Sequence, residues 1–559
     1  MINKKFPLKS IVIPSDSTSN GNRIISAPEI FTAKRTTGKS TQGEIIFRPY
    51  FVQKGRGPHV YDLVWATDQN WDTFYSNISK SEKGISISDT FGEKKFGINC
   101  RWNVEGFGYT NITADNGGEF YFLPPDGKQI EFNLNYELAK SRVFRNRTRL
   151  AHLKKDGWNP SKELLMHLDL SEELLEDAVR KMTVHVKCAE LSQLSLNYAL
   201  WGSEKMELEK AEYIINKKGY RSDFLMGCDA RSFYQMYQDK FLDQFSKLFN
   251  YANITFVVKG DGLMSDYQPG KGKINPETRE VLINKLKERN IKSQERLLFW
   301  FHDCCIPDWL RNMKYDELLS YSEKLTTDTM KRFGDSLYAM EVINELHDWA
   351  NELNLSHEEI TNLTKHIADV SKSVAPNVKT TINSCCLFGE YIQLKQYSSG
   401  KPAKYRQRTP FQWTKDLMEA GAKIDIIELQ MYYPYRDLQD AILMTERFEI
   451  FNKPMHYSEV GVAGGPTDRS IKLGTVNFPN EPYLWHHPWD EETQADWLES
   501  IYTLAYSKDY IKACNWFDFA DPYSYMDNGG LLRSPEGETK AAYDRLYNLQ
   551  QKWKNLKGS

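Results

Sequence analysis

The feature that most constrains this fold is an alternation of apolar runs and amphipathic segments from about residue 223 to the C-terminal end. Short apolar runs are typical of buried parallel strands, and apolar residues three and four positions apart are typical of helices covering a sheet. The runs predict eight strands, at residues 224–228, 254–258, 296–301, 338–344, 379–383, 424–430, 454–458 and 511–517. The amphipathic segments predict helices at residues 232–250, 276–290, 315–333, 357–375, 411–420, 438–451, 491–507 and 540–556. Eight strand–helix pairs favour an α/β fold of the (β/α)8 TIM-barrel type over a doubly wound open sheet.

The chain before the barrel divides into three segments. Residues 1–29 are polar and rich in Ser, Asn and Lys, and we expect them to form a flexible tail. Residues 30–135 contain short strand-like runs separated by Gly, Asn and Asp turns, which is typical of a β-sandwich. Residues 136–222 begin with charged helical segments and end in strand-like runs, so we interpret them as a helical connector followed by a β-rich lead-in. The catalytic barrel then occupies residues 223–559.

Aromatic residues in the 30–135 segment bear on its role. Trp and Tyr have flat apolar faces with polar edges, which suit stacking on sugar rings. Six aromatic residues suggest an exposed binding face: Trp65, Trp71, Tyr75, Trp102, Phe107 and Tyr109. The sandwich is therefore either a carbohydrate-binding domain or a structural domain packed on the barrel, since a fold alone does not define a function.

Charge and composition exclude several classes of partner. The 559 residues include 72 Lys plus Arg and 75 Asp plus Glu, so the net charge of −3 offers no basic surplus for nucleic acid or an anionic membrane. No apolar run approaches the roughly 18 residues of a membrane-spanning helix. The eight Cys have neither the spacing of a zinc site nor that of a disulfide framework. We therefore expect no metal ion and no organic cofactor.

Two of the predicted strands end in a carboxylate. The fourth leads into Asn344 and Glu345, and the seventh leads into Glu459. Reactive residues of these barrels project from the carboxyl ends of the strands. Cleavage of a glycosidic bond with retention needs one protonated and one ionised carboxyl group about 5–5.5 Å apart. We predict Glu345 as the acid/base with a raised pKa, Glu459 as the nucleophile, and Asn344 as a ligand of the sugar hydroxyl beside the anomeric carbon.

Six motifs occur in order around the predicted barrel. They lie at residues 298–309, 342–345, 424–430, 458–459, 516–525 and 531–543. Together they resemble glycoside hydrolase family 10, which is best known for endo-β-1,4-xylanases. The resemblance implies that His302 and Trp309 line the glycone site and that Gln430 contacts the sugar. The alternative for His302 is a core histidine, and the alternative for Trp309 is packing in the core.

The eighth-strand motif adds three further candidates. Trp516 either stacks on the substrate or packs in the core, and Tyr525 occupies a position where the family often has Trp. Asp521 is either a turn residue or a partner that orients the site.

The chain also departs from the family pattern. The second-strand segment, residues 260–269, lacks the Asn, Lys and Trp that hold the glycone xylose units in the family. Tyr432 stands where the family has a His that supports the nucleophile. Tyr432 can donate a hydrogen bond to Glu459 but cannot carry a positive charge. The resemblance therefore implies retained catalytic carboxyls within a rebuilt sugar-binding wall.

We expect a retaining glycoside hydrolase that cleaves β-glycosidic bonds in a polysaccharide or oligosaccharide, by resemblance an endo-β-1,4-xylanase. The alternatives are a hydrolase of another β-linked glycan or plant glycoside, and a non-catalytic barrel that binds polysaccharide. The resemblance also implies a secreted, periplasmic or cell-surface location, although no signal peptide is visible in this sequence.

Overall fold

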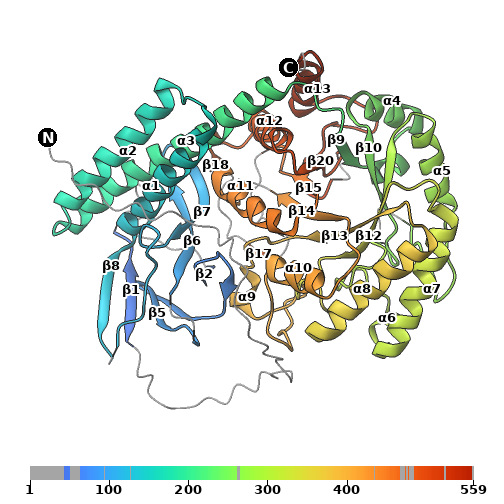
Figure 1. The fold of residues 1–559 in the computed structure, drawn as a ribbon, viewed down its shortest axis with the longest axis horizontal. Coiled ribbons are helices and arrows are strands. Elements are labelled where there is room, and N and C mark those ends of the chain that lie inside the picture. Colours follow the sequence, from blue (N-terminus) through green and yellow to red (C-terminus); the bar gives the residue numbers. More distant parts are fainter. Residues whose placement is uncertain are drawn as a thin grey trace.

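The computed structural model describes residues 43–50, 63–92, 95–125, 127–260, 265–432, 435–465, 472–473, 476–477, 484–521 and 524–556. Figure 1 shows an N-terminal part, built from sheets and long helices, beside a barrel formed by the rest of the chain. The tail predicted at residues 1–29 lies outside the described residues.

Within the described part of the chain, eight parallel strands close into a barrel in the order β10-β11-β12-β13-β14-β15-β20-β9. The strands are β9 (Leu225–Asp229), β10 (Tyr251–Thr255), β11 (Lys292–Arg296), β12 (Ala339–Asn344), β13 (Lys379–Ser384), β14 (Ile426–Tyr432), β15 (Met455–Gly461) and β20 (Ile511–Trp516). The helices are α4 (Gln238–Leu248), α5 (Glu277–Lys287), α6 (Asp308–Arg311), α7 (Tyr315–Phe333), α8 (His357–Val374), α9 (Tyr391–Leu394), α10 (Pro410–Glu419), α11 (Leu438–Glu446), α12 (Glu491–Ser507) and α13 (Ala541–Lys554). The predicted TIM barrel is confirmed.

The third strand lies earlier than the sequence pattern suggested. β11 ends at Arg296, where the prediction began a strand at 296–301. Its residues are polar because the barrel interior is polar at this level: Gln294 donates to Glu428 at 2.9 Å, and Arg296 donates to Glu341 at 3.3 Å. The apolar run that suggested the later strand comes after β11 in the chain and lies outside this strand.

The N-terminal part is built on two sheets, as the β-sandwich prediction required. Among the described residues, one sheet has the order β4-β5-β1-β8 and the other β19-β18-β7-β6-β2-β3. Their strands are β1 (Glu44–Arg48), β2 (Val64–Thr67), β3 (Thr73–Phe74), β4 (Asn77–Ser81), β5 (Gly84–Asp89), β6 (Gly97–Val104), β7 (Gly108–Ala114), β8 (Gln129–Asn133), β18 (Leu484–Trp485) and β19 (His487–Pro488). Phe47 of β1 packs edge-on against Tyr121 at 4.9 Å between ring centroids, which helps to close the core between the sheets.

The aromatic residues expected to form a binding face are mostly in the core. Trp65, Trp102, Phe107 and Tyr109 are at most 2% exposed, and Trp71 and Tyr75 are half-buried. Trp65 lies on β2, Trp102 on β6 and Tyr109 on β7, and the residues of these three strands are all buried. The expectation that these rings are exposed is therefore wrong for the four buried ones, which cannot stack on a glycan.

A long helix replaces the expected β-rich lead-in. The segment 136–222 lies within α1 (Leu134–Leu153), α2 (Lys162–Arg180) and α3 (His185–Lys218) and their connections. Val184 and Val186, whose alternation suggested a strand, are more than half exposed. The buried positions of α3 instead include Cys188, Ser192 and Leu196, which lie four residues apart. That helical spacing decides the structure, and the strand prediction is wrong.

Buried charges join the N-terminal part to the barrel. Arg142 of α1 is 0% exposed and forms ion pairs with Asp437 (2.5 Å) and Asp440 (3.1 Å), which cap and begin α11. Arg145 binds Asp440 and Asp115, both at 3.0 Å. A backbone link adds to these contacts. β18 lies in the connection after β15, and it pairs with β7. The two parts therefore share a desolvated interface, and the N-terminal part is not a tethered module.

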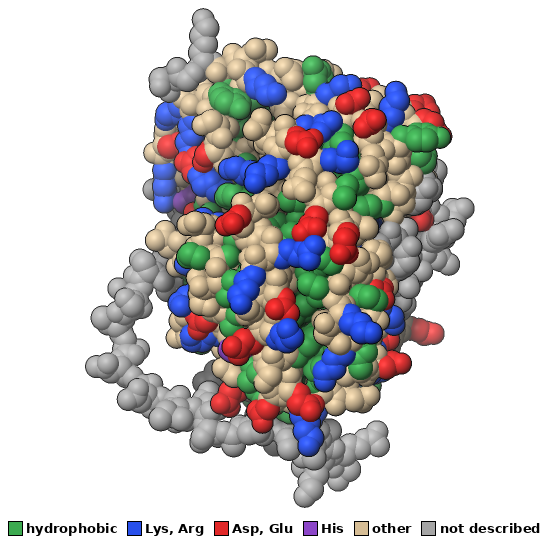
Figure 2. All heavy atoms as spheres, turned by 90° about the vertical axis from the view of Figure 1, so that its right-hand side faces the viewer, with side chains coloured by type: hydrophobic (Ala, Val, Ile, Leu, Met, Phe, Trp, Pro, Cys, Tyr) green, Lys and Arg blue, Asp and Glu red, His purple; other side chains and the backbone are tan. Residues whose placement is uncertain are grey.

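The outer face of the barrel carries both signs of charge. Figure 2 shows this face with basic and acidic side chains intermixed over the helices. Of the helices that the structure describes, none combines the length and apolar character needed to cross a membrane.

Candidate active site

Glu345 and Glu459 lie at the carboxyl end of the barrel, as predicted. Glu345 follows the last residue of β12, and Glu459 lies within β15 near its end. They are 8% and 7% exposed. The backbone of Glu345 has φ of 55°, an unfavourable value for a residue with a side chain. Hydrogen bonds on both sides of its peptide hold this conformation: Glu345 N donates to Asn383 O at 2.9 Å, and Ala350 N donates to Glu345 O at 3.1 Å.

A single amide group fixes the separation of the two carboxyls. Gln430 Nε2 donates to Glu345 Oε1 at 2.8 Å and to Glu459 Oε1 at 3.0 Å. Because both oxygens bind the same nitrogen, they are no more than 5.8 Å apart. Inverting enzymes hold their carboxyls about 6.5–9.5 Å apart and retaining enzymes about 5–5.5 Å apart. The geometry therefore matches that of retaining enzymes.

The two oxygens of Glu459 have different surroundings. Among the described side chains, Oε1 accepts hydrogen bonds from Asn383 at 2.9 Å, from Gln430 and from Arg296. Oε2 accepts from the hydroxyl of Tyr432. Burial raises the pKa of Tyr432, as does the charge of Glu459, so the phenol stays protonated and keeps donating. The predicted contact of Tyr432 with Glu459 is confirmed.

Glu345 has the electrostatic environment of a general acid. Burial raises its pKa, and the neighbouring charge of Glu459 raises it further. Hydrogen bonds from Gln430 and Trp300 oppose the shift, the latter through Nε1 to Glu345 Oε2 at 2.9 Å. The charge of His302 also opposes the shift, and the His302 ring lies beside that of Trp300 with 4.9 Å between centroids. The net direction is upward, which keeps Glu345 protonated to higher pH than an exposed Glu.

Asn344 and Tyr525 lie close to the carboxyl pair. Asn344 is 1% exposed and accepts a hydrogen bond at 2.9 Å from Asn383, which also donates to Glu459. Tyr525 is 45% exposed, and its ring meets that of Tyr432 edge-on at 5.5 Å. The sugar contacts predicted for both residues stay predictions.

Trp309 lies in the short helix α6, which follows β11. Its half-buried ring packs against Tyr321 at 5.5 Å between centroids. Trp309 is therefore supported by the core, and its predicted contact with the glycone stays a prediction.

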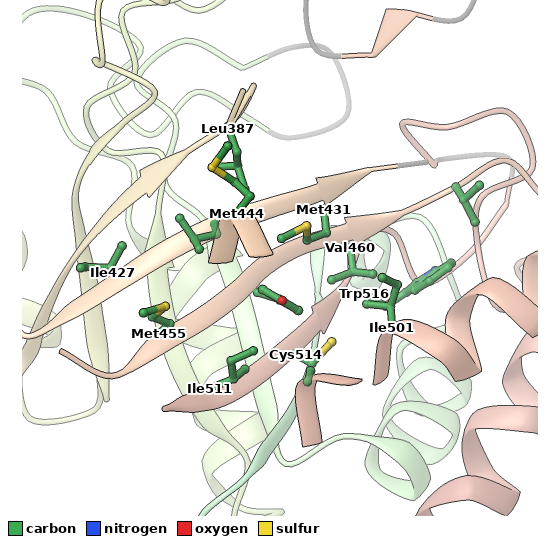
Figure 3. Packing of buried hydrophobic residues seen from close by; sticks show 14 of the residues in the cluster. Leu387, Ile427, Met431, Met444, Met455, Val460, Ile501, Ile511, Cys514 and Trp516 are labelled. Atoms are coloured by element: carbon green, nitrogen blue, oxygen red, sulfur yellow. The ribbon is translucent and has the colours of Figure 1, made fainter. Parts of the chain in front are cut away.

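Trp516 is a core residue and does not stack on the substrate. It is 0% exposed and donates through Nε1 to Gly529 O at 3.0 Å. Figure 3 shows its indole beside Val460 and Ile501, on the side of the barrel wall that packs against the helices. The prediction of stacking is wrong because a strand alternates its faces, and this position faces the helix layer.

Asp521 holds a loop. It accepts hydrogen bonds at 2.9 Å from Ser524 Oγ and from Gly530 N, and it pairs with Lys540 at 3.1 Å. These contacts support the interpretation as a turn residue over that of an orienting partner.

Three residues that contact the carboxyls were missed. Arg296 and Asn383 bind Glu459, and Trp300 binds Glu345. A signal was present for two of them, because a polar residue at the carboxyl end of a barrel strand is a candidate for the site. Asn383 ends the predicted fifth strand and therefore carried this signal. Arg296 ends β11, but the predicted third strand began at this residue, so the prediction placed it at the amino end.

The comparison with known families decides the classification. Residues 236–549 match Glycosyl hydrolase family 10. The chain belongs to this family. Members of family 10 are retaining glycosidases.

The following proteins are distantly similar to this chain. Endo-1,4-beta-xylanase 1 of Arabidopsis thaliana is 22% identical over 343 residues, or 61% of this chain and 31% of that protein. The chain thus spans less than a third of that relative. The solved GH10 xylanase of Thermobacillus composti is 17% identical over 58% of this chain and 97% of its own, with a TM-score of 0.43. Xylanase 10B from Thermotoga petrophila RKU-1, solved with xylobiose, is 16% identical over 62% and 97%, also with a TM-score of 0.43.

Proposed function

We propose that this family 10 member is a retaining hydrolase of a β-1,4-linked glycan of the xylan type. The observation that carries the proposal is the pair of buried carboxyls, Glu345 and Glu459, bridged by Gln430 with their bound oxygens no more than 5.8 Å apart. A barrel that only bound polysaccharide would have no chemical need for two such groups, and this favours catalysis over binding.

The surroundings of each carboxyl suggest the order of events. Glu345 donates its proton to the glycosidic oxygen as the bond to the anomeric carbon breaks. Glu459 attacks that carbon through Oε2, because Oε1 already accepts hydrogen bonds from three donors. The product is a covalent glycosyl ester of Glu459 and a free leaving sugar. Glu345, now a carboxylate, takes a proton from water as the water attacks the same carbon and releases Glu459.

The choice of glycan rests on family membership, and one feature favours a second candidate. Tyr432 occupies the position of a nucleophile-supporting His in the sequence pattern of the family. The altered segment 260–269 is described only in part, since residues 261–264 lie outside the described residues. A different β-linked glycan or a plant glycoside is therefore the second candidate substrate.

The test is an activity panel of xylo-oligosaccharides, xylan, cello-oligosaccharides, mannan and mixed-linkage β-glucan. Glu459→Ala and Glu345→Ala are compared with Glu352→Ala, the same change at a buried carboxyl that instead accepts a hydrogen bond from Ser399 N at 3.0 Å. We expect cleavage of a xylan substrate, loss of at least about 1000-fold in Glu459→Ala, and β-anomeric first product by proton NMR. An α-anomeric first product, or full activity of Glu459→Ala, would overturn the mechanism. Cleavage of another glycan alone would favour the second candidate.

A further inference from the structure

The hydrogen-bond donors to Glu459 differ in charge. Gln430, Asn383 and Tyr432 are neutral groups, and Tyr432 stands where a His could have been positive. Arg296 is the cation among the described groups that donate to Glu459. Its side chain is 1% exposed, so water screens this charge very little.

We propose that Arg296 is a positioning residue that supplies the nucleophile with a permanent positive charge from the third strand, in place of a titratable group on the sixth. A guanidinium stays protonated throughout the working pH range, unlike an imidazole. The inference rests on the proposed function, because it assigns a role within the same double displacement.

The position of Arg296 is fixed on several sides. Its Nε donates to Glu341 Oε2 at 3.3 Å while Nη2 binds Glu459. The guanidinium carbon lies 5.7 Å from the centre of the Phe517 ring. An Arg held by two carboxyls and an aromatic face has little freedom to rotate, so the orientation of Glu459 is fixed with it.

Carboxyls from four barrel strands face Arg296 in the described part of the interior: Glu459, Glu341, Asp229 and Glu428. Burial raises the pKa of Glu341 to about 8 and that of Asp229 to about 7. Both are therefore largely uncharged at mildly acidic pH. Glu428 accepts hydrogen bonds from Gln294 and Thr381, the latter at 2.7 Å. Arg296 donates to Glu459 directly, whereas no hydrogen bond joins it to Glu428 among the described contacts.

This charge has opposite effects on the two chemical steps. Glu459 loses its negative charge when it attacks the sugar, so the Arg296 contact does not favour this first step. Glu459 regains the charge when water releases the sugar, and Arg296 stabilises the departing carboxylate. We therefore expect Arg296 to speed the second step relative to the first.

The experiment compares Arg296→Gln, Arg296→Lys and the parent enzyme on an activated aryl β-xyloside by stopped flow. In Arg296→Gln we expect kcat to fall about ten- to hundredfold, KM to fall with it, and a burst of released phenol to show accumulation of the covalent ester. The acidic limb of the pH profile should move to higher pH by about one to three units. Arg296→Lys retains the charge and should restore most of the second-step rate and the position of the limb.

Arg279→Gln is the matched control, since Arg279 is 0% exposed but donates to the backbone, including Thr255 O at 3.1 Å. We expect it to lower stability without a burst or a shift of the pH limb. The double variant Arg296→Gln, Glu341→Gln replaces both members of the buried pair by neutral side chains and covers the case in which the single variant does not fold. Equal behaviour of Arg296→Gln and Arg279→Gln would overturn the proposal.

A second measurement separates this inference from the proposed function. Carbon-13 NMR of the ligand-free protein follows the titration of the catalytic carboxyl pair without any substrate. We expect the titration to move to higher pH in Arg296→Gln and to stay near the parent position in Arg296→Lys. An unmoved titration overturns the role of Arg296, whereas failure of every glycoside to react overturns the proposed function alone.

Discussion

The buried ion pair between Arg142 and Asp437 gives a quantitative test of how the N-terminal part is attached. Both side chains are 0% exposed, and the guanidinium binds both carboxylate oxygens, at 2.5 and 3.0 Å. Removal of one partner from such a pair costs about 3–5 kcal/mol, because the other charge stays buried without compensation. Arg142→Met should therefore lower the free energy of unfolding by about 3–5 kcal/mol.

The second variant is Asp437→Ser, because Asp437 is also the N-cap of α11 and Ser retains a capping oxygen. We expect a smaller single cost, because Arg142 keeps its ion pair with Asp440 at 3.1 Å, and a coupling energy of about 2–3 kcal/mol between the two positions in a double-mutant cycle. Burial raises the pKa of Asp437 to about 6, although the charge of Arg142 lowers it. Arg142→Met should therefore raise the pKa of Asp437 further.

The assay is urea unfolding, followed by tryptophan fluorescence and by circular dichroism. Arg180→Met is the control, since Arg180 forms an exposed ion pair with Asp177 on α2 and its loss should cost less than about 1 kcal/mol. If Arg142→Met costs no more than this control, or if the two interface variants are additive, the interface is not desolvated and the reasoning fails.

Three further outcomes follow from the site. Because Glu345 must be protonated to act and burial raises its pKa, activity should persist above the usual Glu range and fall as pH rises through that raised pKa; the alkaline limb of kcat/KM measures this. Trp300→Phe removes a donor that lowers the pKa of Glu345, so the alkaline limb should move to still higher pH, and an unmoved limb would contradict the assigned contact. Trp516→Phe should destabilise the fold by about 1–3 kcal/mol with KM unchanged, and a raised KM at constant stability would show that the indole touches substrate.

The barrel was predictable from sequence because its elements follow simple periodicities. α7 and α12 begin and end where the apolar spacing placed them, at Tyr315–Phe333 and Glu491–Ser507. Glu345 and Glu459 were predictable for a related reason, since parallel strands bring their carboxyl ends to one edge. Local pattern and closed topology were sufficient for these features.

The remaining features depend on contacts between distant segments. Arg296 is polar on a barrel strand because carboxyls from other strands surround it, and no window of sequence around it contains them. Trp65 and Trp102 were expected to be exposed, yet Trp65 stacks on Tyr435 with 6.4 Å between ring centroids, and Trp102 Nε1 donates to Gln193 of α3 at 3.0 Å. Burial by a helix about 90 residues away cannot be inferred from the aromatic content of the strands themselves.

The pairing of β18 with β7 has a consequence for protein engineering. One edge of the six-stranded sheet is formed by β19 (His487–Pro488) next to β18 (Leu484–Trp485), although the other strands of this sheet lie before residue 115. A chimera with its crossover near residue 222 would give the sheet and its edge strand to different parents. Domain shuffling in this protein should therefore transplant the segment after the seventh barrel strand together with the N-terminal part, as one discontinuous unit.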